Sequence, residues 1–263
     1  MHRRTAHGDV TAFELFTRRT QVARYSVHVF VVRGAMVDTG FHGARRDIMR
    51  LVDELGPRGA FVTHWHEDHA GNVELLARKG VPLALGDETA ARVRDVAPIA
   101  LYRRWTWSSM PPLRTRHAAF APEDLALLPA PGHSADHHVV WDTSTRTLFA
   151  GDLYLGVKVR VTHPSEDPYR LVDSLRAAIA LAPARLFCAH RGLVERPVEQ
   201  LRAKAEWITE TVGEIERRIA RGDADDRAIA RELLGRETFT GWISRGEYAH
   251  VNIVAAVRRR LDA

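Results

Sequence analysis

Three histidines and an aspartate lie within six consecutive residues of this chain, His64-Trp65-His66-Glu67-Asp68-His69. Imidazole nitrogens and carboxylate oxygens are ligands that zinc and its first-row neighbours accept, and no thiolate is needed. The spacing therefore predicts a metal site, and the alternative is a solvated polar loop.

The residues before this motif indicate how it is held. Ala60–Thr63 is a short apolar run that predicts a buried strand, and a helical stretch follows the motif. His64 and His66 are two residues apart and point the same way off the end of a strand, whereas Asp68 and His69 belong to the next turn. The motif therefore predicts ligands for two metal positions.

Other potential ligands follow apolar runs that predict strands. His133 comes after Leu125–Leu128, Asp152 after Thr147–Phe149, and His190 after Arg185–Ala189. Taken singly, each histidine is as readily structural as metal-binding. Asp152 is more readily structural than metal-binding, because Gly-Asp is a common turn. Because strand ends commonly build the sites of α/β proteins, the three together strengthen the metal interpretation. The remaining histidines, His137 among them, are expected to be surface or hydrogen-bonded core residues.

Bulk properties are typical of a cytoplasmic enzyme. A chain of 263 residues buries about three quarters of its unfolded surface. The single Cys188 excludes an internal disulfide, and the first residues lack the apolar stretch of a secretory signal. No apolar run approaches the roughly 18 residues that span a bilayer, so we expect no membrane insertion. The net charge of +5 is spread along the chain, so we expect no nucleic-acid partner.

Strand and helix signals alternate along the chain, which predicts an α/β fold. The expected strands are 10–16, 25–32, 60–63, 81–85, 125–128, 138–141, 147–149 and 185–189, and the expected helices are 44–55, 73–77, 87–96 and 169–181. Residues 98–122, rich in Trp and Pro, predict a loop or lid without regular structure. Residues 197–263 predict a helical appendage with helices at 198–221, 225–234 and 248–261. It would cover the core, shape the pocket or form a homodimer contact.

The order of these motifs resembles that of the metallo-β-lactamase superfamily. The matching residues are H64-x-H66-x-D68-H69, G132-H133, G151-D152 and H190, with V37-D38-T39-G40 upstream, within roughly residues 10 to 195. The resemblance implies an αββα sandwich of two mixed sheets with helices outside. We therefore expect a catalytic core at residues 1–196 and a helical extension at 197–263.

The resemblance also implies the roles of the ligands. His64, His66 and His133 would hold a first metal, Asp68, His69 and His190 a second, and Asp152 would bridge the two. Asp38 would be the carboxylate that orients a ligand imidazole, although a D-T-G turn would explain it equally well.

Residues that differ from those of particular branches of the superfamily narrow the possible functions of this chain. His66 stands where the flavodiiron branch has Glu, and Asp152 stands where some β-lactamases have Cys. Cys188 is expected to be a buried strand residue rather than a ligand. The insertion of processing nucleases and the basic tail of glyoxalase II have no clear match, so the substrate class stays open.

A pair of cations determines the expected mechanism. Two divalent ions about 3.5 to 4 Å apart would lower the pKa of a shared water to near neutral and give a metal-bound hydroxide nucleophile. Asp68 or Asp152 would orient it and pass its proton to the leaving group. Tyr154, Lys158 and Arg160 are candidates for binding an anionic substrate group, or form only the polar face of a strand.

We therefore expect a hydrolase with two zinc ions, or alternatively iron or manganese, that acts on a small carboxylic ester, thioester or lactone. One alternative is a mononuclear iron dioxygenase acting on a persulfide, since one branch of the superfamily uses the His, His, Asp subset in this way. A phosphodiesterase or nuclease is another. A catalytically silent binding module is disfavoured because no expected ligand is missing.

Overall fold

The computed structural model describes residues 2–22, 24–159 and 161–262. The chain divides into two compact units, which we describe separately. The first contains residues 1–129, 136–152 and 183–195, and the second contains residues 130–135, 153–182 and 196–263. The boundary expected between residues 196 and 197 stays a prediction.

A six-stranded sheet forms one layer of the first unit, with its strands in the order β1-β2-β3-β4-β5-β6. Neighbouring strands from β1 to β4 are antiparallel, and β4, β5 and β6 are parallel. The strands are β1 His2–His7, β2 Val10–Leu15, β3 Val27–Val32, β4 Ala35–Val37, β5 Gly59–Phe61 and β6 Leu83–Ala84. The β5 strand leads directly into the histidine motif.

A five-stranded sheet forms the second layer of this unit, in the order β11-β10-β9-β8-β7. Its β9 and β10 strands are parallel and its other pairs are antiparallel, so both sheets are mixed. The strands are β7 Leu125–Pro129, β8 His138–Asp142, β9 Thr147–Phe149, β10 Arg185–Cys188 and β11 Gly192–Val194. Asp152 and His190 therefore follow two neighbouring parallel strands, as expected from the sequence.

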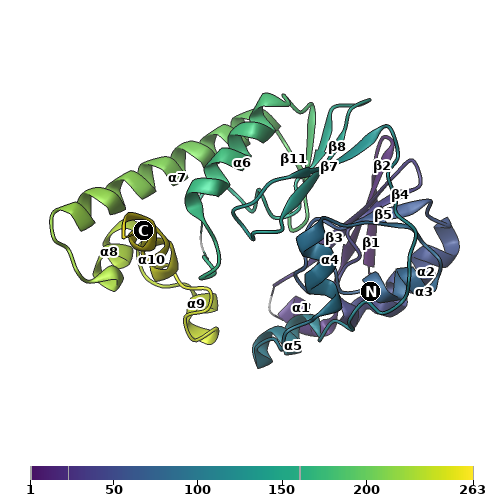
Figure 1. Ribbon diagram of the computed structural model, residues 1–263, viewed down its shortest axis with the longest axis horizontal. Helices are drawn as coiled ribbons and strands as arrows, with labels where there is room; N and C mark the ends of the chain where they lie inside the picture. Colours follow the sequence, from purple (N-terminus) through teal and green to yellow (C-terminus); the bar gives the residue numbers. More distant parts are fainter. Residues whose placement is uncertain (1, 23, 160, 263) are drawn as a thin grey trace. The chain divides into compact units, whose positions relative to one another are not determined.

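The two sheets face each other across an apolar core (Figure 1). Phe30 of β3 lies 5.5 Å from Phe149 of β9 and 5.3 Å from Phe187 of β10, measured between ring centroids. All three rings are at most 1% exposed. Because burial of a phenylalanine contributes about 1.5–3 kcal/mol, this cluster is a main source of cohesion between the sheets.

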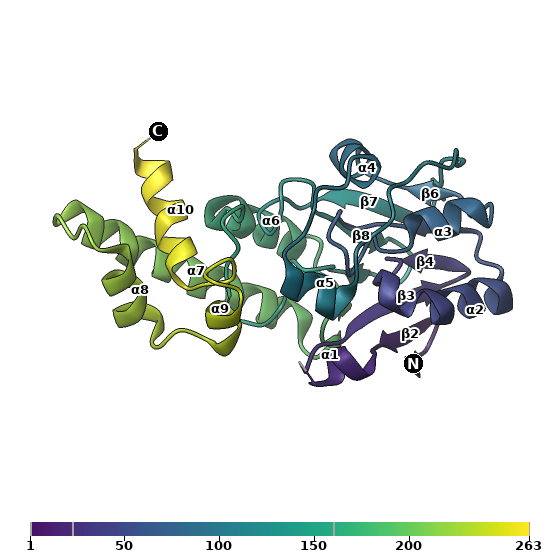
Figure 2. The ribbon, with the colours of Figure 1, turned by 90° about the horizontal axis from the view of Figure 1, so that it is seen from below.

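Helices cover the outer face of the first sheet, and Figure 2 shows α2 and α3 beside its strands. The helices of this unit are α1 Arg18–Val22, α2 Arg45–Leu55, α3 Val73–Arg78, α4 Asp87–Arg94 and α5 Leu101–Trp107, and a short 3-10 turn spans His42–Ala44. Ile48, Leu76 and Val93 are fully buried in the cluster that joins α2, α3 and α4 to the sheet. This second apolar layer fixes the start of α3, directly after the histidine motif.

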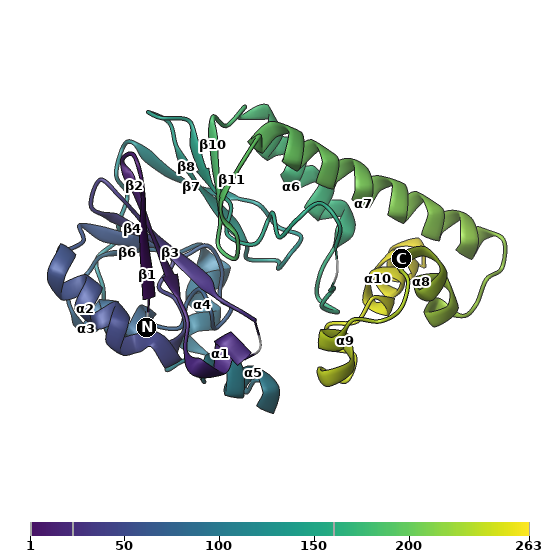
Figure 3. The same ribbon diagram turned by 180° about the vertical axis from the view of Figure 1, so that it is seen from behind.

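The second unit is built from helices α6 Pro168–Ala180, α7 Pro197–Ala220, α8 Asp226–Leu234, α9 Phe239–Ile243 and α10 Val251–Leu261. Figure 3 shows α6 beside α7, and α8 and α10 close together near the far end of α7. Asp167 caps α6 by accepting hydrogen bonds from the backbone N–H groups of Tyr169 and Arg170, and Pro168 occupies the first turn. None of the helices in the described part of the chain is long and apolar enough to cross a membrane.

The α/β class and the two mixed, facing sheets are confirmed, but the expectation of irregular structure across residues 98–122 is wrong for residues 101–107. That segment contains α5, which is seven residues long. The sequence analysis also missed β1, because its solvent-exposed sequence HRRTAH lacks the apolar alternation of a half-buried strand. It pairs with β2 along its whole length.

Candidate metal centre

The histidine motif is a buried loop between β5 and α3. His64 and His69 are fully buried, and His66 and Asp68 are 6% and 8% exposed. The loop turns back on itself because the N–H groups of His69 and Ala70 both donate to His66 O, at 3.0 and 2.8 Å. The four side chains therefore belong to one tight turn, not to a solvated loop.

Gly71 makes this turn possible. A Cβ at this position would lie 2.5 Å from Glu67 O, 2.6 Å from Gly40 O and 2.6 Å from His42 N. All three are backbone atoms, which cannot rotate away as a side chain would. Only glycine therefore lets the motif pack against the loop that follows β4.

Ligand atoms converge from the motif and from the ends of β9 and β10. His64, His69 and Asp152 form one group that could hold a metal ion, and Asp68, His69 and His190 form another, each with its ligand atoms within 4.8 Å of one another. Asp152 Oδ1 lies 3.4 Å from both His69 Nε2 and His190 Nε2. The His69 imidazole and the neighbouring Asp152 carboxylate thus stand between the two halves of the cluster.

His66 points its Nδ1 inward. This atom lies 2.9 Å from His64 Nε2, so the two imidazoles of the H-x-H sequence meet at one point. The short distance between these two nitrogens, just beyond the end of β5, matches the expectation that His64 and His66 face the same position.

Polar groups outside the cluster orient the imidazoles. Asp38 Oδ2 lies 2.8 Å from His69 Nδ1, and Asp38 Oδ1 accepts hydrogen bonds from the N–H and hydroxyl of Thr63. The Thr63 hydroxyl lies 3.0 Å from His64 Nδ1, and His190 Nδ1 lies 2.8 Å from Ser26 O. These contacts leave the Nε2 atoms of all three histidines for the cluster interior.

Asp38 combines both roles that the sequence left open. Its φ is +63°, so it lies in the left-handed region of a turn, where Asp is tolerated better than most residues. Its carboxylate also contacts the imidazole of His69. The turn is therefore what aims this carboxylate at the histidine.

His137 is the contact that the sequence analysis did not assign to the site. Its ring is 1% exposed, as expected for a hydrogen-bonded core histidine. Its Nε2 accepts a hydrogen bond of 3.0 Å from the backbone N–H of Asp152, and it packs 4.9 Å from the ring of His64. His137 therefore holds the backbone of the residue expected to bridge the metals. The adjacency of His137 to the Gly132-His133 motif was the only sequence signal.

The cluster attracts positive charge. Burial lowers the pKa of His69, but the carboxylates of Asp152, Asp68 and Asp38 raise it more strongly, so the net pKa is well above its usual value. Burial raises the pKa of Asp152, and the imidazoles of His190 and His69 overcome this and hold it well below the usual range. Carboxylates that stabilise a proton on an imidazole would stabilise a metal cation in its place.

The donor set fits a divalent metal of the first transition row or zinc. Within the described residues, His69 Nε2 is buried and makes no hydrogen bond of good geometry. The carboxylate oxygens near it are Asp152 Oδ1 at 3.4 Å and Asp68 Oδ2 at 3.8 Å. An imidazole nitrogen held by Asp38 on its far side and aimed at two carboxylates is typical of a metal ligand.

The second unit holds the remaining predicted residues. His133 lies after Gly132, whose φ is +138° and whose Cβ would lie 2.4 Å from the backbone of Leu171. His133 Nδ1 lies 3.6 Å from Glu166 Oε1. Its place among the metal ligands stays a prediction from the motif.

The expected substrate-binding residues have different surroundings. Tyr154 is buried and its hydroxyl donates to Gln200 Oε1 at 2.5 Å, and Lys158 is exposed. Neither belongs to a strand, so the alternative that they form the polar face of one is wrong for residues 154–159. Arg160 lies outside the described residues. Cys188 is fully buried in β10, as expected for a strand residue, and burial raises the pKa of its thiol.

A comparison with protein families identifies the fold. The family model of the metallo-β-lactamase superfamily matches residues 23–190, which include the histidine motif and both strand-end ligands of the first unit. The chain belongs to the metallo-β-lactamase superfamily.

Two curated animal proteins are among the relatives of this superfamily member. It is 30% identical over 177 residues to the Beta-lactamase-like protein 2 homolog of Drosophila melanogaster, covering 64% of this chain and 58% of the relative. It is 27% identical over 180 residues to the protein of the same name from Caenorhabditis elegans, covering 63% and 55%. The chain thus spans little more than half the length of these relatives.

Solved structures confirm the αββα sandwich with additional C-terminal helices. A metallo-β-lactamase family protein from Thermus thermophilus matches with a TM-score of 0.69 at 16% identity, over 97% of this chain and 94% of that chain. The metallo-β-lactamase FIM-1 of Pseudomonas aeruginosa, solved in a mono-zinc form, matches with a TM-score of 0.62 at 16% identity, over 80% and 95%. At such identities the match establishes the fold, and the site must be argued from its own residues.

Proposed function

We propose that this protein is a metal-dependent hydrolase that holds two divalent cations, with zinc as the first candidate and iron and manganese as alternatives. The observation that carries the proposal is the double cluster around His69 and Asp152, with ligand atoms from the motif and from the ends of two strands. Membership of the metallo-β-lactamase superfamily supports the same class of chemistry.

The proposed ligands fall into two sets. His64 and His66, whose nitrogens lie 2.9 Å apart, would hold the first cation, together with His133 by its position in the sequence motif. Asp68, His69 and His190 would hold the second, since Asp68 Oδ2 lies 3.3 Å from His190 Nε2. Asp152 would contact both cations. When bound, such a pair of cations supplies Lewis acidity that activates water as the nucleophile and polarises the scissile bond.

The chain's own carboxylates would handle the proton. Asp68 is 8% exposed and Asp152 5% exposed, so each is shielded from bulk solvent except toward the cluster. Either carboxylate would orient the attacking water, accept its proton as the water attacks, and then pass that proton to the leaving group. His137 would keep Asp152 in place through the backbone N–H. No side-chain nucleophile is required.

The proposed substrate is a small carboxylic ester, thioester or lactone. The proposed location of the protein is the cytoplasm. Lys158, which is exposed, would bind an anionic group of the substrate, and Arg160 is proposed for the same role from its sequence position alone. The Tyr154 hydroxyl already donates to Gln200, so Tyr154 would bind an anion only if that hydrogen bond opened. A homodimer formed through the C-terminal helices remains a proposal.

The test combines metal analysis with a substrate panel. We expect close to two zinc ions per chain and turnover of at least one thioester, ester or lactone. His66→Ala should abolish that turnover, whereas His117→Ala, at a half-buried histidine in the loop before β7, should keep it. Full turnover by the His66→Ala variant would refute the assigned site.

The same measurements distinguish the alternatives. One iron and no zinc in protein from unsupplemented cells would replace the hydrolase with the persulfide dioxygenase. Salt-sensitive binding to RNA or DNA at about 50 mM salt would favour a nuclease or phosphodiesterase, because such binding reports phosphate contacts.

A further inference from the structure

The α5 helix, which the sequence did not predict, contacts the candidate metal centre at two points. Arg103 donates from Nε to Glu67 Oε1 at 2.7 Å and from Nη2 to Glu67 Oε2 at 2.6 Å. Trp107, one helical turn later, lies with its ring centroid 6.3 Å from that of His190. Because residues four apart share one face of a helix, both contacts come from the same side of α5.

Both contacts involve parts of the cluster that we assign to the second cation. Glu67 stands between His66 and Asp68 in the motif, so the ion pair fixes the backbone that carries Asp68. Trp107 also packs 5.1 Å from Phe41 in the layer outside the first sheet, which anchors the indole beside His190. The helix therefore touches the supports of two of the three ligands Asp68, His69 and His190.

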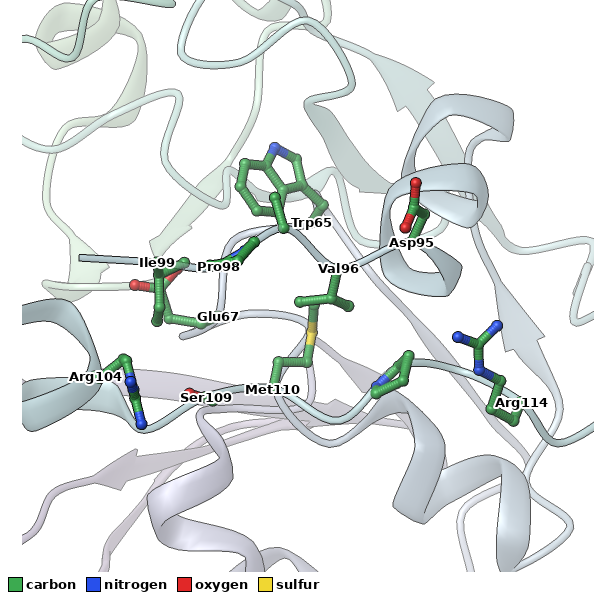
Figure 4. A pocket seen from close by; sticks show the side chains of 12 residues that line it. Trp65, Glu67, Asp95, Val96, Pro98, Ile99, Arg104, Ser109, Met110 and Arg114 are labelled. Carbon is green, nitrogen blue, oxygen red and sulfur yellow. The ribbon is translucent and has the colours of Figure 1, made fainter. Parts of the chain in front are cut away.

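The Arg103–Glu67 pair is a buried attachment of α5 to the histidine motif. Arg103 is the only buried residue among the seven of α5, whereas Leu101 is 78% exposed and Trp105 46% exposed. A cavity of about 280 Å³ lies between Glu67 and the segments on either side of the helix (Figure 4). Trp65, Val96, Ile99 and Met110 line it, so an open space takes the place of a packed core there.

The Arg103–Glu67 pair also neutralises a buried negative charge next to Asp68. Glu67 is 2% exposed and adjoins Asp68, so an unpaired Glu67 would place a second buried negative charge beside a ligand carboxylate. Burying a charge without a partner is strongly destabilising, and the loop would shift to expose it. The Arg103 guanidinium matches both oxygens of the carboxylate and removes that tendency.

We infer that α5 is a brace for the metal centre, in which Arg103 and Trp107 are positioning residues that hold Asp68 and His190 at the separation a single cation requires. This inference rests on the proposed function, because it presumes that these residues bind a metal. It assigns to α5 a role in metal affinity, separate from any contact with substrate.

The experiment measures stepwise zinc binding by competition with a chromophoric chelator in Arg103→Met, Arg103→Lys and Trp107→Leu. We expect Arg103→Met to weaken the binding of one zinc equivalent at least tenfold and to leave the other unchanged. Arg103→Lys keeps the charge but not the two-point geometry, so a smaller loss is expected. Trp107→Leu should weaken the same equivalent about threefold or more.

The control is Arg33→Met, which removes the partly exposed ion-pair partner of the fully buried Asp142 in the same unit. It should lower the thermal midpoint of metal-free protein and leave both zinc affinities unchanged. Wild-type zinc affinities in folded Arg103→Met and Trp107→Leu would overturn the brace, and so would an equal loss in Arg33→Met. If Arg103→Met does not fold, Trp107→Leu and Arg103→Lys decide. A wild-type chain that binds no metal would instead refute the proposed function.

Discussion

The first unit contains two clusters of charged groups, each with at least one buried carboxylate, and they differ in where their positive charge comes from. In the candidate metal centre, Asp38, Asp68 and Asp152 face imidazoles. In the second cluster, Arg33 donates to Asp142 at 2.9 Å and to Asp124 at 2.8 Å. We call this second group, with Asp9 and Arg185, the arginine cluster.

The two clusters are found at opposite ends of the same strands. Thr147, at the start of β9, accepts a hydrogen bond from Arg185 of the arginine cluster, and Asp152 lies just beyond the end of β9. The arginine cluster contains guanidinium groups, which are cations at every physiological pH. In the metal centre, Asp68 and Asp152 face the imidazoles of His69 and His190, which are cations only when protonated, so a metal ion can replace those protons. The two clusters therefore differ both in the source of the cation and in burial, because His69 is fully buried whereas Arg33 is 30% exposed.

The largest effect is expected from a substitution that breaks the arginine cluster. Asp142 is fully buried and accepts hydrogen bonds from Arg33, Ser144 and Thr145. Asp142→Ala should lower the free energy of unfolding by about 3–5 kcal/mol, because donors of Ser144, Thr145 and Arg33 all lose their shared buried acceptor. Urea denaturation of the metal-free protein measures this loss. Zinc affinity should not change, and a parallel loss of zinc would show that the two clusters are not independent.

The next effect acts on the backbone of the metal loop. Gly71→Ala should lower the free energy of unfolding by about 1–3 kcal/mol, because its Cβ meets backbone atoms that cannot give way. Zinc binding should weaken with it, since the same backbone sets the positions of His66 and His69. Gly213→Ala in α7 is the control, because its Cβ would meet only the end of Arg217 at 3.6 Å. A Gly71→Ala protein as stable as wild type would contradict the tight turn.

The contrast between the clusters also explains what the sequence could predict. The candidate ligands His64, Asp152 and His190 were predictable because each comes within three residues of the end of an apolar strand, so local pattern places them near strand ends. The Arg103–Glu67 pair joins residues 36 apart in the chain through a short helix whose buried residue is charged. Apolar periodicity carries no signal for such a helix, because the pattern marks apolar faces only. The arginine cluster was missed for the same reason.

A smaller effect sharpens the comparison by testing the carboxylate that orients His69. Asp38→Asn keeps the size and the left-handed turn, which Asn tolerates, and removes the charge beside His69 Nδ1. Zinc affinity should fall about 10- to 100-fold. Asp124→Asn, which makes the matching change in the arginine cluster, should leave zinc affinity unchanged. Equal zinc affinities in the Asp38→Asn and wild-type proteins would remove Asp38 from the support of the centre.

The smallest effect concerns a carboxylate of a third kind, held by backbone amides and an arginine together. Glu74 accepts hydrogen bonds from the N–H groups of Arg114 and Thr115 and from Arg78 Nε. Burial raises the pKa of Glu74, and these hydrogen bonds overcome it and lower the pKa to about 2. Because the folded pKa is below the unfolded value of 4.5, the stabilisation is complete above pH 4.5 and is lost as the pH falls toward 2.

In metal-free protein, the advantage in stability of the wild type over Glu74→Gln should therefore be present at about pH 6 and shrink at about pH 3, as measured by urea denaturation at the two values. Glu88→Gln is the control, because among the described residues Glu88 pairs only with Arg92, on an exposed helix face where such pairs contribute little. An advantage that did not change with pH would mean that Glu74 stabilises the 113–115 segment by its shape and not by its charge. Glu74 would then differ from the carboxylates of the metal centre and the arginine cluster, in which the charge itself determines what the carboxylate binds.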